Sequence, residues 1–423
     1  MASSTRRLDQ LAASVSSSAA ILGEYLESRN LPQPSVNVGG LAGYSGLPPD
    51  ISTARRSLQE SVLELAYLAS GPQEYMIRYT TEYVGITALR WIYHFRIFEH
   101  VPLDGVVSYK ELAKLAGQDE RTLKRIVRRA ILNRFFIEPR PGYIAHTSST
   151  ALLLKDSDVR DMVGLMIEEG FDSSTRYSEA YEKWGPSNSA TETAFQLAFQ
   201  TDLKYFDWLE QRPENLRRFG GMMKAHGTNE SYSSENFVKV FNWSLIGEGK
   251  VVDIGGGLGH MSIAIAKEFP NIKFVVQDFP DTAKQGAERC SEELRDRISF
   301  EGYDFFNPQP VEGADIYMLK AVLHDHPDPD VEKIIRNTVT AMRPGSRILI
   351  IDGVLPEPGA MHPVEERAVR SLDLQMGMFF NAGERDPEQW CSVIANSDPR
   401  LKVKSINRVP GNVSSGIEVV FEP

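Results

Sequence analysis

The sequence changes rhythm near residue 248, where short β-branched runs begin to alternate with helical patterns. The runs are KVVDIGG, NIKFVVQD, ADIYMLKAV, SRILIIDGV, VKSINRV and SGIEVVFEP. Alternation of strands with helices predicts an α/β fold built on a doubly wound parallel sheet. The last two runs, joined by PGNVSSG, predict an antiparallel hairpin, so we expect an antiparallel C-terminal strand at the edge of the sheet.

The preceding 245 residues follow a helical period instead. One helix is predicted over residues 8–30 and is followed by a Gly/Pro-rich linker. A later basic segment reads as a helix, a turn at Gly117, a second helix from about Glu120 and a hairpin turning at Pro141-Gly142, the outline of a winged helix-turn-helix. A helical, aromatic-rich connector follows, whose rings are core residues or walls of a ligand pocket. We therefore expect four segments: 1–50 (helix and linker), 51–155 (helical and winged-helix domain), 156–245 (connector and substrate-pocket segment) and 246–423 (the strand-helix domain).

A winged helix raises the question of DNA binding. Residues 101–150 carry nine Lys and Arg against five Asp and Glu. The alternative is that the winged helix has only a structural role in packing, and that its arginines are solvated or paired with acidic neighbours. The chain as a whole has a formal net charge of −11, which argues against nucleic acid or an anionic membrane as a partner. We expect neither.

The composition also indicates a compartment. Apolar residues make up 42% and charged residues 24%, as in ordinary globular proteins. No apolar run approaches the ~18 residues of a membrane span, and the N-terminal segment lacks the long apolar stretch of a secretory signal. Two cysteines, Cys290 and Cys391, are too few for a disulfide framework or a zinc site. A cytoplasmic protein is expected.

The first strand runs directly into a glycine-rich turn, GGGLG at residues 255–259. Such a turn lets backbone approach a nucleotide-like ligand. The dinucleotide fingerprint needs a third glycine where His260 stands. Asp253 instead precedes the turn, and Asp278 ends the next strand, where a carboxylate can accept hydrogen bonds from both ribose hydroxyls. The pattern DxGxGxG with a second acid indicates S-adenosylmethionine, whose ammonium group needs an acidic loop; a glycine turn that binds nothing is the alternative.

Further motifs follow in order: FVVQDFP, GYDFFNP, LKAVLHDHPD, ILIIDGVLPEPG and NAGERDPEQW. With VVDIGGGLG, they make residues 50–423 resemble the plant- and fungal-type small-molecule O-methyltransferases that depend on S-adenosylmethionine. The resemblance implies a winged-helix domain for homodimerisation, a Rossmann-like catalytic domain and a small-molecule substrate from secondary metabolism. It also assigns the winged helix to dimerisation.

The resemblance implies roles for individual residues. Catalytic roles fall to His324 as the general base and to Asp352 and Glu384 as its acidic partners. Substrate contacts fall to Asp325 and Asn381. Besides Asp253, the cofactor-binding positions are Gly255, Gly257, Asp278, Asp304, Phe305 and Lys320. No metal site is expected.

The motif His324-Asp325-His326 departs from the family pattern His-Asp-Trp. Two histidines two residues apart also allow metal ligation, and a histidine there can equally be a capping or core residue. A general base fits the chemistry, since a phenol with a pKa of about 10 needs a proton acceptor at neutral pH. Asp352 stands where plant members carry glutamate, which shortens the side chain and keeps its charge.

His146, at the end of the wing hairpin, is a second candidate for substrate contact, unless it only satisfies backbone carbonyls. The leading expectation is O-methylation of a phenolic or enolic hydroxyl of a secondary metabolite. The altered motif keeps a different class of enzyme open, an S-adenosylmethionine-binding pericyclase or dehydratase. In such an enzyme Lys320, His146 and His324 would act as polar or acid-base groups on a polyketide-derived intermediate without methyl transfer.

Overall fold

The computed structural model describes residues 6–41, 43–44, 46–228, 237–408 and 412–422. The chain divides into two compact units: unit 1 is Met1–Asp172 with Arg212–Ala225, and unit 2 is Ser173–Gln211 with His226–Pro423. The four expected segments stay a prediction; helices of the expected connector are shared between the two units. No described helix is long and apolar enough to cross a membrane.

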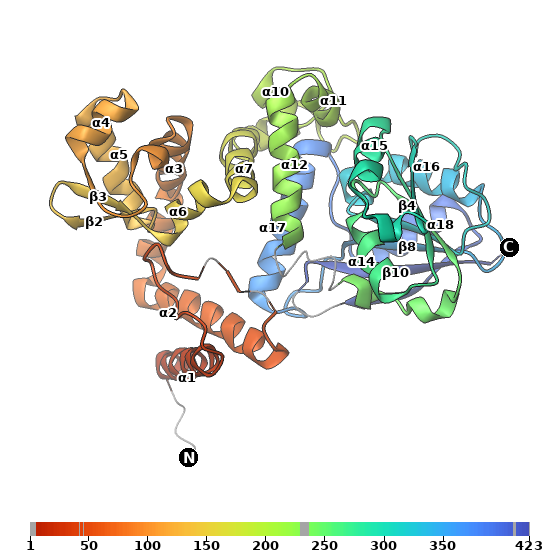
Figure 1. The fold of residues 1–423 in the computed structure, drawn as a ribbon, viewed down its shortest axis with the longest axis horizontal. Coiled ribbons are helices and arrows are strands. Elements are labelled where there is room, and N and C mark those ends of the chain that lie inside the picture. Colours follow the sequence, from red (N-terminus) through yellow and green to blue (C-terminus); the bar gives the residue numbers. More distant parts are fainter. Residues whose placement is uncertain (1–5, 42, 45, 229–236, 409–411, 423) are drawn as a thin grey trace, which may run out of the picture. The chain divides into compact units, whose positions relative to one another are not determined.

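Unit 1 begins with the predicted N-terminal helix α1 (Arg7–Ser28), which packs along α2 (Pro49–Thr81) (Figure 1). Leu22, Leu26 and Ile51 form the buried contact between them. Gly71 kinks α2 with a φ of 70°, a conformation that glycine adopts without steric cost. The remaining elements outside the winged helix are α3 (Tyr83–His94), η1 (Ile97–His100), α6 (Ser148–Lys155), α7 (Ser157–Leu165), the π-helical turn η2 (Met166–Gly170), α8 (Phe171–Ser174) and α12 (Pro213–Thr228). The boundary between the units falls within α8 and within α12.

The winged helix forms as predicted. It consists of β1 (Val107–Ser108), α4 (Tyr109–Ala116), α5 (Glu120–Leu132), β2 (Phe136–Arg140) and β3 (Tyr143–His146), with strand order β1-β3-β2. Gly117 ends α4 with a φ of 65°, and the Asp119 side chain caps α5 by accepting a hydrogen bond from the Thr122 amide at 2.8 Å. On α5, Arg128 pairs with Glu138 at 2.9 Å, so part of the basic face is neutralised within the unit.

Unit 2 contains a seven-stranded sheet of order β6-β5-β4-β7-β8-β10-β9; its strands β4, β8 and β10 are labelled in Figure 1. The strands are β4 (Lys250–Ile254), β5 (Lys273–Asp278), β6 (Ile298–Gly302), β7 (Ile316–Lys320), β8 (Arg347–Gly353), β9 (Leu401–Arg408) and β10 (Ser414–Phe421). The five strands β6, β5, β4, β7 and β8 are parallel to one another, and β10 pairs antiparallel with β8 and β9. The predicted α/β class with a doubly wound sheet is confirmed.

One detail of the predicted sheet edge is corrected. The β9–β10 hairpin forms, but the antiparallel C-terminal strand β10 lies second from the edge, and β9 is the edge strand. The burial of the strands explains this order: Ile417 and Val419 of β10 are fully buried, whereas β9 has only Leu401 buried and is otherwise partly or fully exposed. A strand with one solvated face tolerates the edge better than a strand buried on both faces. The hairpin turn falls partly on residues 409–411, which lie outside the described residues.

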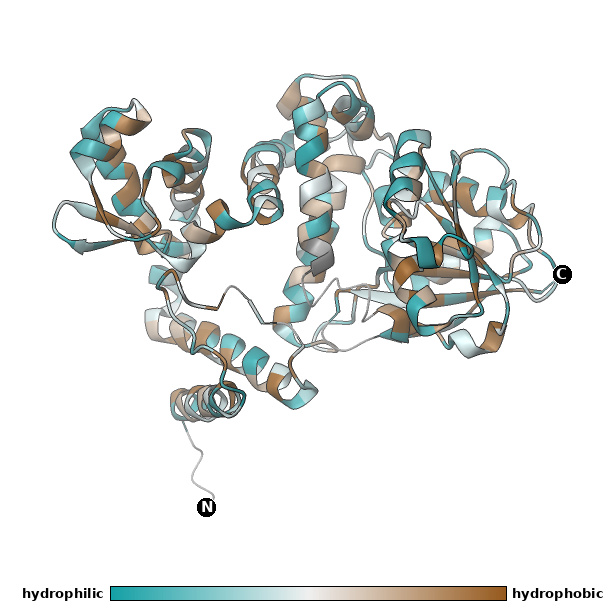
Figure 2. Ribbon diagram, in the orientation of Figure 1, coloured by the Kyte–Doolittle hydropathy of each residue, from teal (hydrophilic) through white to brown (hydrophobic). Residues whose placement is uncertain are grey.

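Helices cover both faces of the sheet, because successive residues of a strand point to opposite sides. Val252 of β4 joins the core under α16 (Asp328–Val339) and α18 (Pro387–Ser397). Its neighbour Val251 joins the core under α14 (His260–Glu268). Hydrophobic colouring runs along β4 and β8 in the interior of the sheet (Figure 2). Parallel strands covered in this way end at one edge of the sheet. From β4 the chain builds β5 and β6 on one side and then crosses to build β7 and β8 on the other side. Ligands bind in such sheets at the strand ends where the order reverses in this way.

The aromatic-rich helices of unit 2 pack together as one cluster. Phe195 of α10 (Ala194–Phe199) stacks on Phe379 of α17 (Pro363–Phe380), with ring centroids 5.7 Å apart. Tyr205 of α11 (Tyr205–Glu210) meets Phe380 edge-on at 5.6 Å. The remaining elements of unit 2 are α9 (Tyr177–Trp184), η4 (Val238–Val240), η5 (Trp243–Ile246), α15 (Pro280–Arg289), η6 (Glu292–Leu294) and η7 (Leu323–Asp325).

Candidate functional site

The glycine-rich turn after β4 is held tightly on one side and open on the other. The amides of Gly255 and Gly256 both donate to the Gln277 carbonyl of the neighbouring strand, at 2.8 and 3.1 Å. A Cβ on Gly256 would come within 2.6 Å of the Asp253 carboxyl carbon, so glycine is required there. Gly257 has a φ of 58°, and a Cβ on it would meet none of the described atoms within 4 Å. The turn therefore leaves open space for a ligand beside the partly buried backbone of Gly257.

Asp278 faces this turn from the end of β5. Its Oδ2 accepts a hydrogen bond from the Gly257 amide at 2.9 Å, and its Oδ1 accepts one from the Phe279 amide at 2.8 Å. Burial raises the pKa of Asp278, while the two amides oppose that rise. Each carboxylate oxygen has a second lone pair, so the group can still accept hydrogen bonds from a diol.

The buried Asp253, two residues before the turn, interacts electrostatically with the half-buried Lys320. Asp253 accepts a hydrogen bond from the Ser262 hydroxyl at 2.6 Å, but its Oδ1 is buried without a hydrogen-bond partner among the described residues. Burial raises the pKa of Asp253 to about 6, and it lowers the pKa of Lys320, which the charges of Asp253 and Asp352 oppose. An orphaned buried carboxylate oxygen is costly unless a ligand satisfies it. A cationic ligand group suits this position.

Asp304 and Phe305 follow β6 in the motif GYDFFNP. The side chain of Asp304 is exposed and accepts hydrogen bonds from the Phe306 amide at 2.9 Å and from the Asn307 side chain at 3.0 Å. Phe305 is partly buried against the core of the sheet. The turn is thus locally ordered with an aromatic ring beside it.

His324 lies on η7, a single turn that follows β7. Its Nδ1 is 2.8 Å from Glu384 Oε1, and its Nε2 is 3.7 Å from Asp325 Oδ1, which is too far for a hydrogen bond. Burial lowers the pKa of His324, but the charges of Asp325, Glu384 and Asp352 outweigh it and raise that pKa to about 10. The structure thus brings together the three residues predicted to be catalytic. Their electrostatic balance favours the imidazolium.

Both acidic partners of His324 keep an oxygen without a partner. Asp352, on β8, accepts a hydrogen bond from the Leu323 amide through Oδ2 at 3.2 Å, and burial raises its pKa to about 7. Among the described residues, Asp352 Oδ1 and Glu384 Oε2 have no hydrogen-bond partner. Gly353 makes room for Glu384, because a Cβ on Gly353 would overlap the Glu384 carboxylate. The cluster therefore depends on a glycine that sequence inspection did not single out.

His326 occupies the position of the family's tryptophan. Its ring meets Phe305 and Phe306 edge-on, with centroids 5.4 and 5.5 Å away. Burial, reinforced by Lys204, His324 and Arg385, lowers the pKa of His326 to about 4. His326 is consequently a neutral aromatic packing residue at neutral pH. In this respect it substitutes for the larger ring.

Two of the predicted substrate contacts are engaged within the protein. In unit 1, the ring nitrogens of His146 lie 2.9 Å from the Thr150 hydroxyl and 2.9 Å from the Val101 carbonyl oxygen, and the side chain is buried. This geometry agrees with the second of the two alternatives for His146. In unit 2, Asn381 ends α17 with a φ of 52° and donates from its amide to the carbonyls of Ser189 and Glu192, at 2.9 and 3.0 Å. Its Nδ2 therefore links the loop of residues 189–192 to the end of α17 by hydrogen bonds.

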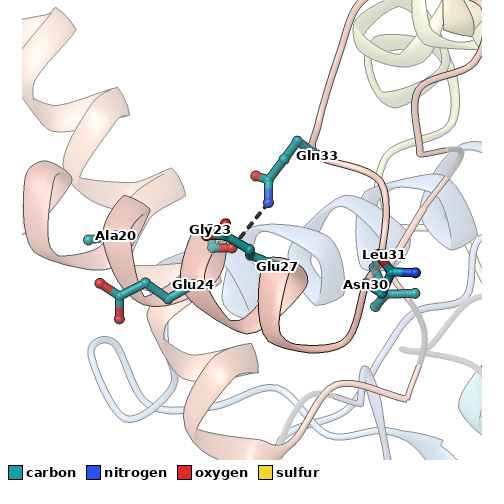
Figure 3. A pocket seen from close by; sticks show the side chains of 7 residues that line it. All are labelled: Ala20, Gly23, Glu24, Glu27, Asn30, Leu31 and Gln33. Atoms are coloured by element: carbon teal, nitrogen blue, oxygen red, sulfur yellow. Dashed lines mark hydrogen bonds between the residues drawn. The ribbon is translucent and has the colours of Figure 1, made fainter.

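Two other features of the described residues were compared with the predicted site residues. A surface pocket on α1 contains none of the predicted site residues (Figure 3); its lining is Ala20, Gly23, Glu24, Glu27, Asn30, Leu31 and Gln33. Gln33 bridges it by donating to the Gly23 carbonyl at 3.1 Å. No grouping of three or more His, Cys, Asp or Glu suited to a metal ion occurs in the part of the chain that the structure describes.

Sequence inspection missed three residues that shape the site. Besides Gly353, they are Asp373, whose carboxylate accepts a hydrogen bond from the Glu384 amide at 3.0 Å, and Arg385. Arg385 donates to backbone carbonyls on both sides of His324. The only signal for Arg385 is its place directly after Glu384 in NAGERDPEQW.

Comparisons with known proteins establish the family of the chain. Residues 188–397 match the O-methyltransferase domain family. The chain is 37% identical to O-methyltransferase bik3 of Gibberella fujikuroi over 98% of this chain and 93% of that protein. The chain belongs to this methyltransferase family, whose cofactor is S-adenosylmethionine.

Two solved structures share the fold. One, of OxaC in complex with sinefungin and meleagrin, has a TM-score of 0.76 and 23% identity, covering 97% of this chain and 99% of that one. The other, titled "A Pericyclic Reaction enzyme", has a TM-score of 0.72 and 25% identity, covering 88% of this chain and 94% of that one. The fold is therefore found both in a complex with a cofactor analogue and in a pericyclase.

Proposed function

We propose that the chain is an S-adenosylmethionine-dependent O-methyltransferase acting on a phenolic or enolic hydroxyl, with His324 as the general base. The observation that carries the proposal is the contact of 2.8 Å between His324 Nδ1 and the buried carboxylate of Glu384. A histidine held by an acid through one nitrogen presents the other nitrogen to a reacting group in a defined tautomer.

The residues around the glycine turn fit the cofactor. Asp278 would accept hydrogen bonds from its ribose, the backbone of Gly257 would line its amino-acid part, and the orphaned Oδ1 of Asp253 offers an acceptor to its ammonium. Phe305 and Asp304 would border the base. When bound, S-adenosylmethionine supplies a methyl group already activated on a sulfonium.

The chain's own residues then have to orient the acceptor and remove its proton. With the Nδ1 proton directed to Glu384, Nε2 of His324 carries the lone pair that accepts the hydroxyl proton. The resulting imidazolium is stabilised by Glu384, Asp325 and Asp352, whose charges already raise the pKa of His324 in the ligand-free chain. At neutral pH that pKa keeps His324 protonated until a cation enters the acidic cluster or the pH rises.

A second candidate is a pericyclase that binds the same cofactor without transferring its methyl group. The structural neighbour that is 25% identical supports it, as does His326 in place of the family's tryptophan. Of the three groups such an enzyme would use, His146 has both ring nitrogens engaged within unit 1. The intact set of His324, Asp352 and Glu384 favours methyl transfer.

A product assay separates the two functions. Purified protein is incubated with methyl-labelled S-adenosylmethionine and a panel of phenolic and polyketide-derived hydroxy compounds. Methyl transfer predicts label in the product and an equal amount of S-adenosylhomocysteine. A dehydrated or isomerised product with an unchanged methyl count would replace the proposal by the pericyclase.

We also propose that the chain forms a homodimer through unit 1. Several large apolar side chains of α2 and α3 are exposed, among them Met76, Ile77, Tyr79 and Tyr83 at 57–66%, and apolar residues recur along α2 in Figure 2. An exposed apolar group of this size indicates an interaction surface. Light scattering after size exclusion is expected to give twice the chain mass, and Ile77→Glu is expected to give the monomer. A monomeric unaltered chain would contradict the proposal.

A further inference from the structure

Arg385 is a buried cation directly after Glu384, only 5% exposed. Its Nη1 donates to the Leu323 carbonyl at 3.2 Å, and its Nη2 donates to the His326 carbonyl at 2.8 Å. These carbonyls lie immediately before His324 and two residues after it. The guanidinium therefore spans the whole turn that carries the proposed base.

The position of Arg385 is itself fixed from several sides. Its Nε donates to Asp328 Oδ1 at 2.8 Å, at the start of α16. The guanidinium carbon lies 5.2 Å from the ring centroid of Trp390 on α18. The Leu355 amide donates to the Arg385 carbonyl at 3.0 Å, just beyond the strand that carries Asp352. Arg385 is thus held by α16, by α18 and by the segment after β8, so its contacts restrain the position of the turn.

The turn needs such support because its own structure is weak. It is a single 3-10 turn, and Ala321 before it has a φ of 52°, which costs energy in a residue with a Cβ. The Leu323 amide donates a hydrogen bond to Asp352, and the Leu323 carbonyl accepts one from Arg385. Only a planar group with several donors can hold two carbonyls and a carboxylate at once, and lysine lacks that geometry.

We propose that Arg385 is a positioning residue that fixes the backbone of residues 323–326 so that the His324 ring stays against Glu384. The inference rests on the proposed function of His324, but its geometric part is independent of which reaction is catalysed. Glu384 orients the side chain and Arg385 orients the backbone beneath it. Adjacent residues thus hold the base from two directions.

The test compares Arg385→Lys, which keeps the charge, with Arg400→Lys as a matched control. Arg400 pairs with Asp398 at 2.7 Å on the surface of unit 2 and is half exposed. For Arg385→Lys we expect unchanged S-adenosylhomocysteine affinity and a kcat lowered about 100-fold, the usual cost of misplacing a reacting group by an ångström. The control is expected to keep kcat within twofold.

A double-mutant cycle separates positioning from general stability. In a His324→Ala background, Arg385→Lys is expected to lower the residual kcat less than twofold, because it acts through a group that is no longer present. An equal 100-fold loss in both backgrounds would overturn the proposal. If Arg385→Lys does not fold, Asp328→Asn is used in its place, because it weakens the contact between Arg385 and the exposed Asp328. The same double-mutant cycle is then measured, and a smaller loss of kcat is expected.

The His324 imidazole of ligand-free protein gives a readout that does not depend on the reaction. In nitrogen-proton correlation spectra, Arg385→Lys is expected to shift or broaden the Nδ1 proton that bonds Glu384. An unchanged His324 signal would overturn the proposal even if activity fell. A changed signal in a protein without methyl transfer would uphold Arg385 and refute the proposed function instead.

Discussion

Replacing Glu384 by glutamine isolates the charge that acts on His324. The Glu384 side chain is fully buried and its Oε1 lies 2.8 Å from Nδ1, so the glutamine amide oxygen can keep the hydrogen bond and only the charge is lost. Hydrogen bonds to charged groups contribute ~1.5–3 kcal/mol and neutral ones ~0.5–1.5 kcal/mol. The difference of ~1–1.5 kcal/mol corresponds to about one pKa unit. The pKa of His324, about 10 in the unaltered chain, should therefore fall by about one unit.

The pKa is read from a proton titration of the histidine ring signals, with His324→Ala identifying the resonance among the eight histidines of the chain. Glu388→Gln, an exposed glutamate in the first turn of α18, is the matched control and should leave the titration unchanged. A pKa of His324 that stays the same or rises in Glu384→Gln would refute the assignment of Glu384 as its charge partner.

Three further outcomes follow from the same cluster. Gly353→Ala should separate Glu384 from His324, since the added Cβ overlaps the carboxylate, and should lower kcat at least tenfold in steady-state assays; Gly220→Ala, where a Cβ meets no described atom within 4 Å, should not. His326→Phe should leave the pH dependence of kcat between pH 5 and 9 unchanged, because burial holds the pKa of His326 near 4. A shift of the pH–rate profile in this range would show that His326 titrates there. The raised pKa of Asp352, about 7, means that the folded chain holds this proton more tightly than the unfolded chain, so its contribution to stability is complete below about pH 4 and is lost as the pH rises through 7. Denaturant titrations should show the unaltered chain losing stability relative to Asp352→Asn between pH 5 and 8, and parallel curves would contradict the shift.

The framework of unit 2 is readable from the sequence because its signals are local. Each parallel strand is a short apolar run, and the glycine turn with Asp278 marks the strand ends where a ligand binds. The strand order is a different matter, since β9 and β10 have similar apolar content in sequence and only their burial in the fold distinguishes the edge. The antiparallel strand was therefore expected one position too far out.

Some contacts of the candidate site could likewise be predicted from the sequence, and others could not. The contact between His324 and Glu384 was expected from motifs sixty residues apart that recur in a known family. The contacts of Arg385 with two carbonyls were not, because backbone acceptors leave no trace in the residue types around them. The motif position of Asn381 predicted a contact with substrate, but it did not predict the hydrogen bonds that its Nδ2 donates to the carbonyls of Ser189 and Glu192.

The central claim is that His324 removes the acceptor's proton, and acceptors of different acidity test it directly. The rates of His324→Ala and the unaltered chain are compared on a phenol with a pKa near 10 and on an electron-poor analogue that is already ionised at the assay pH. General base catalysis predicts a loss of ~10²–10⁴-fold on the first acceptor and less than tenfold on the second, which has no proton to remove. An equal loss on both acceptors, or no loss on the first, would contradict the role of His324.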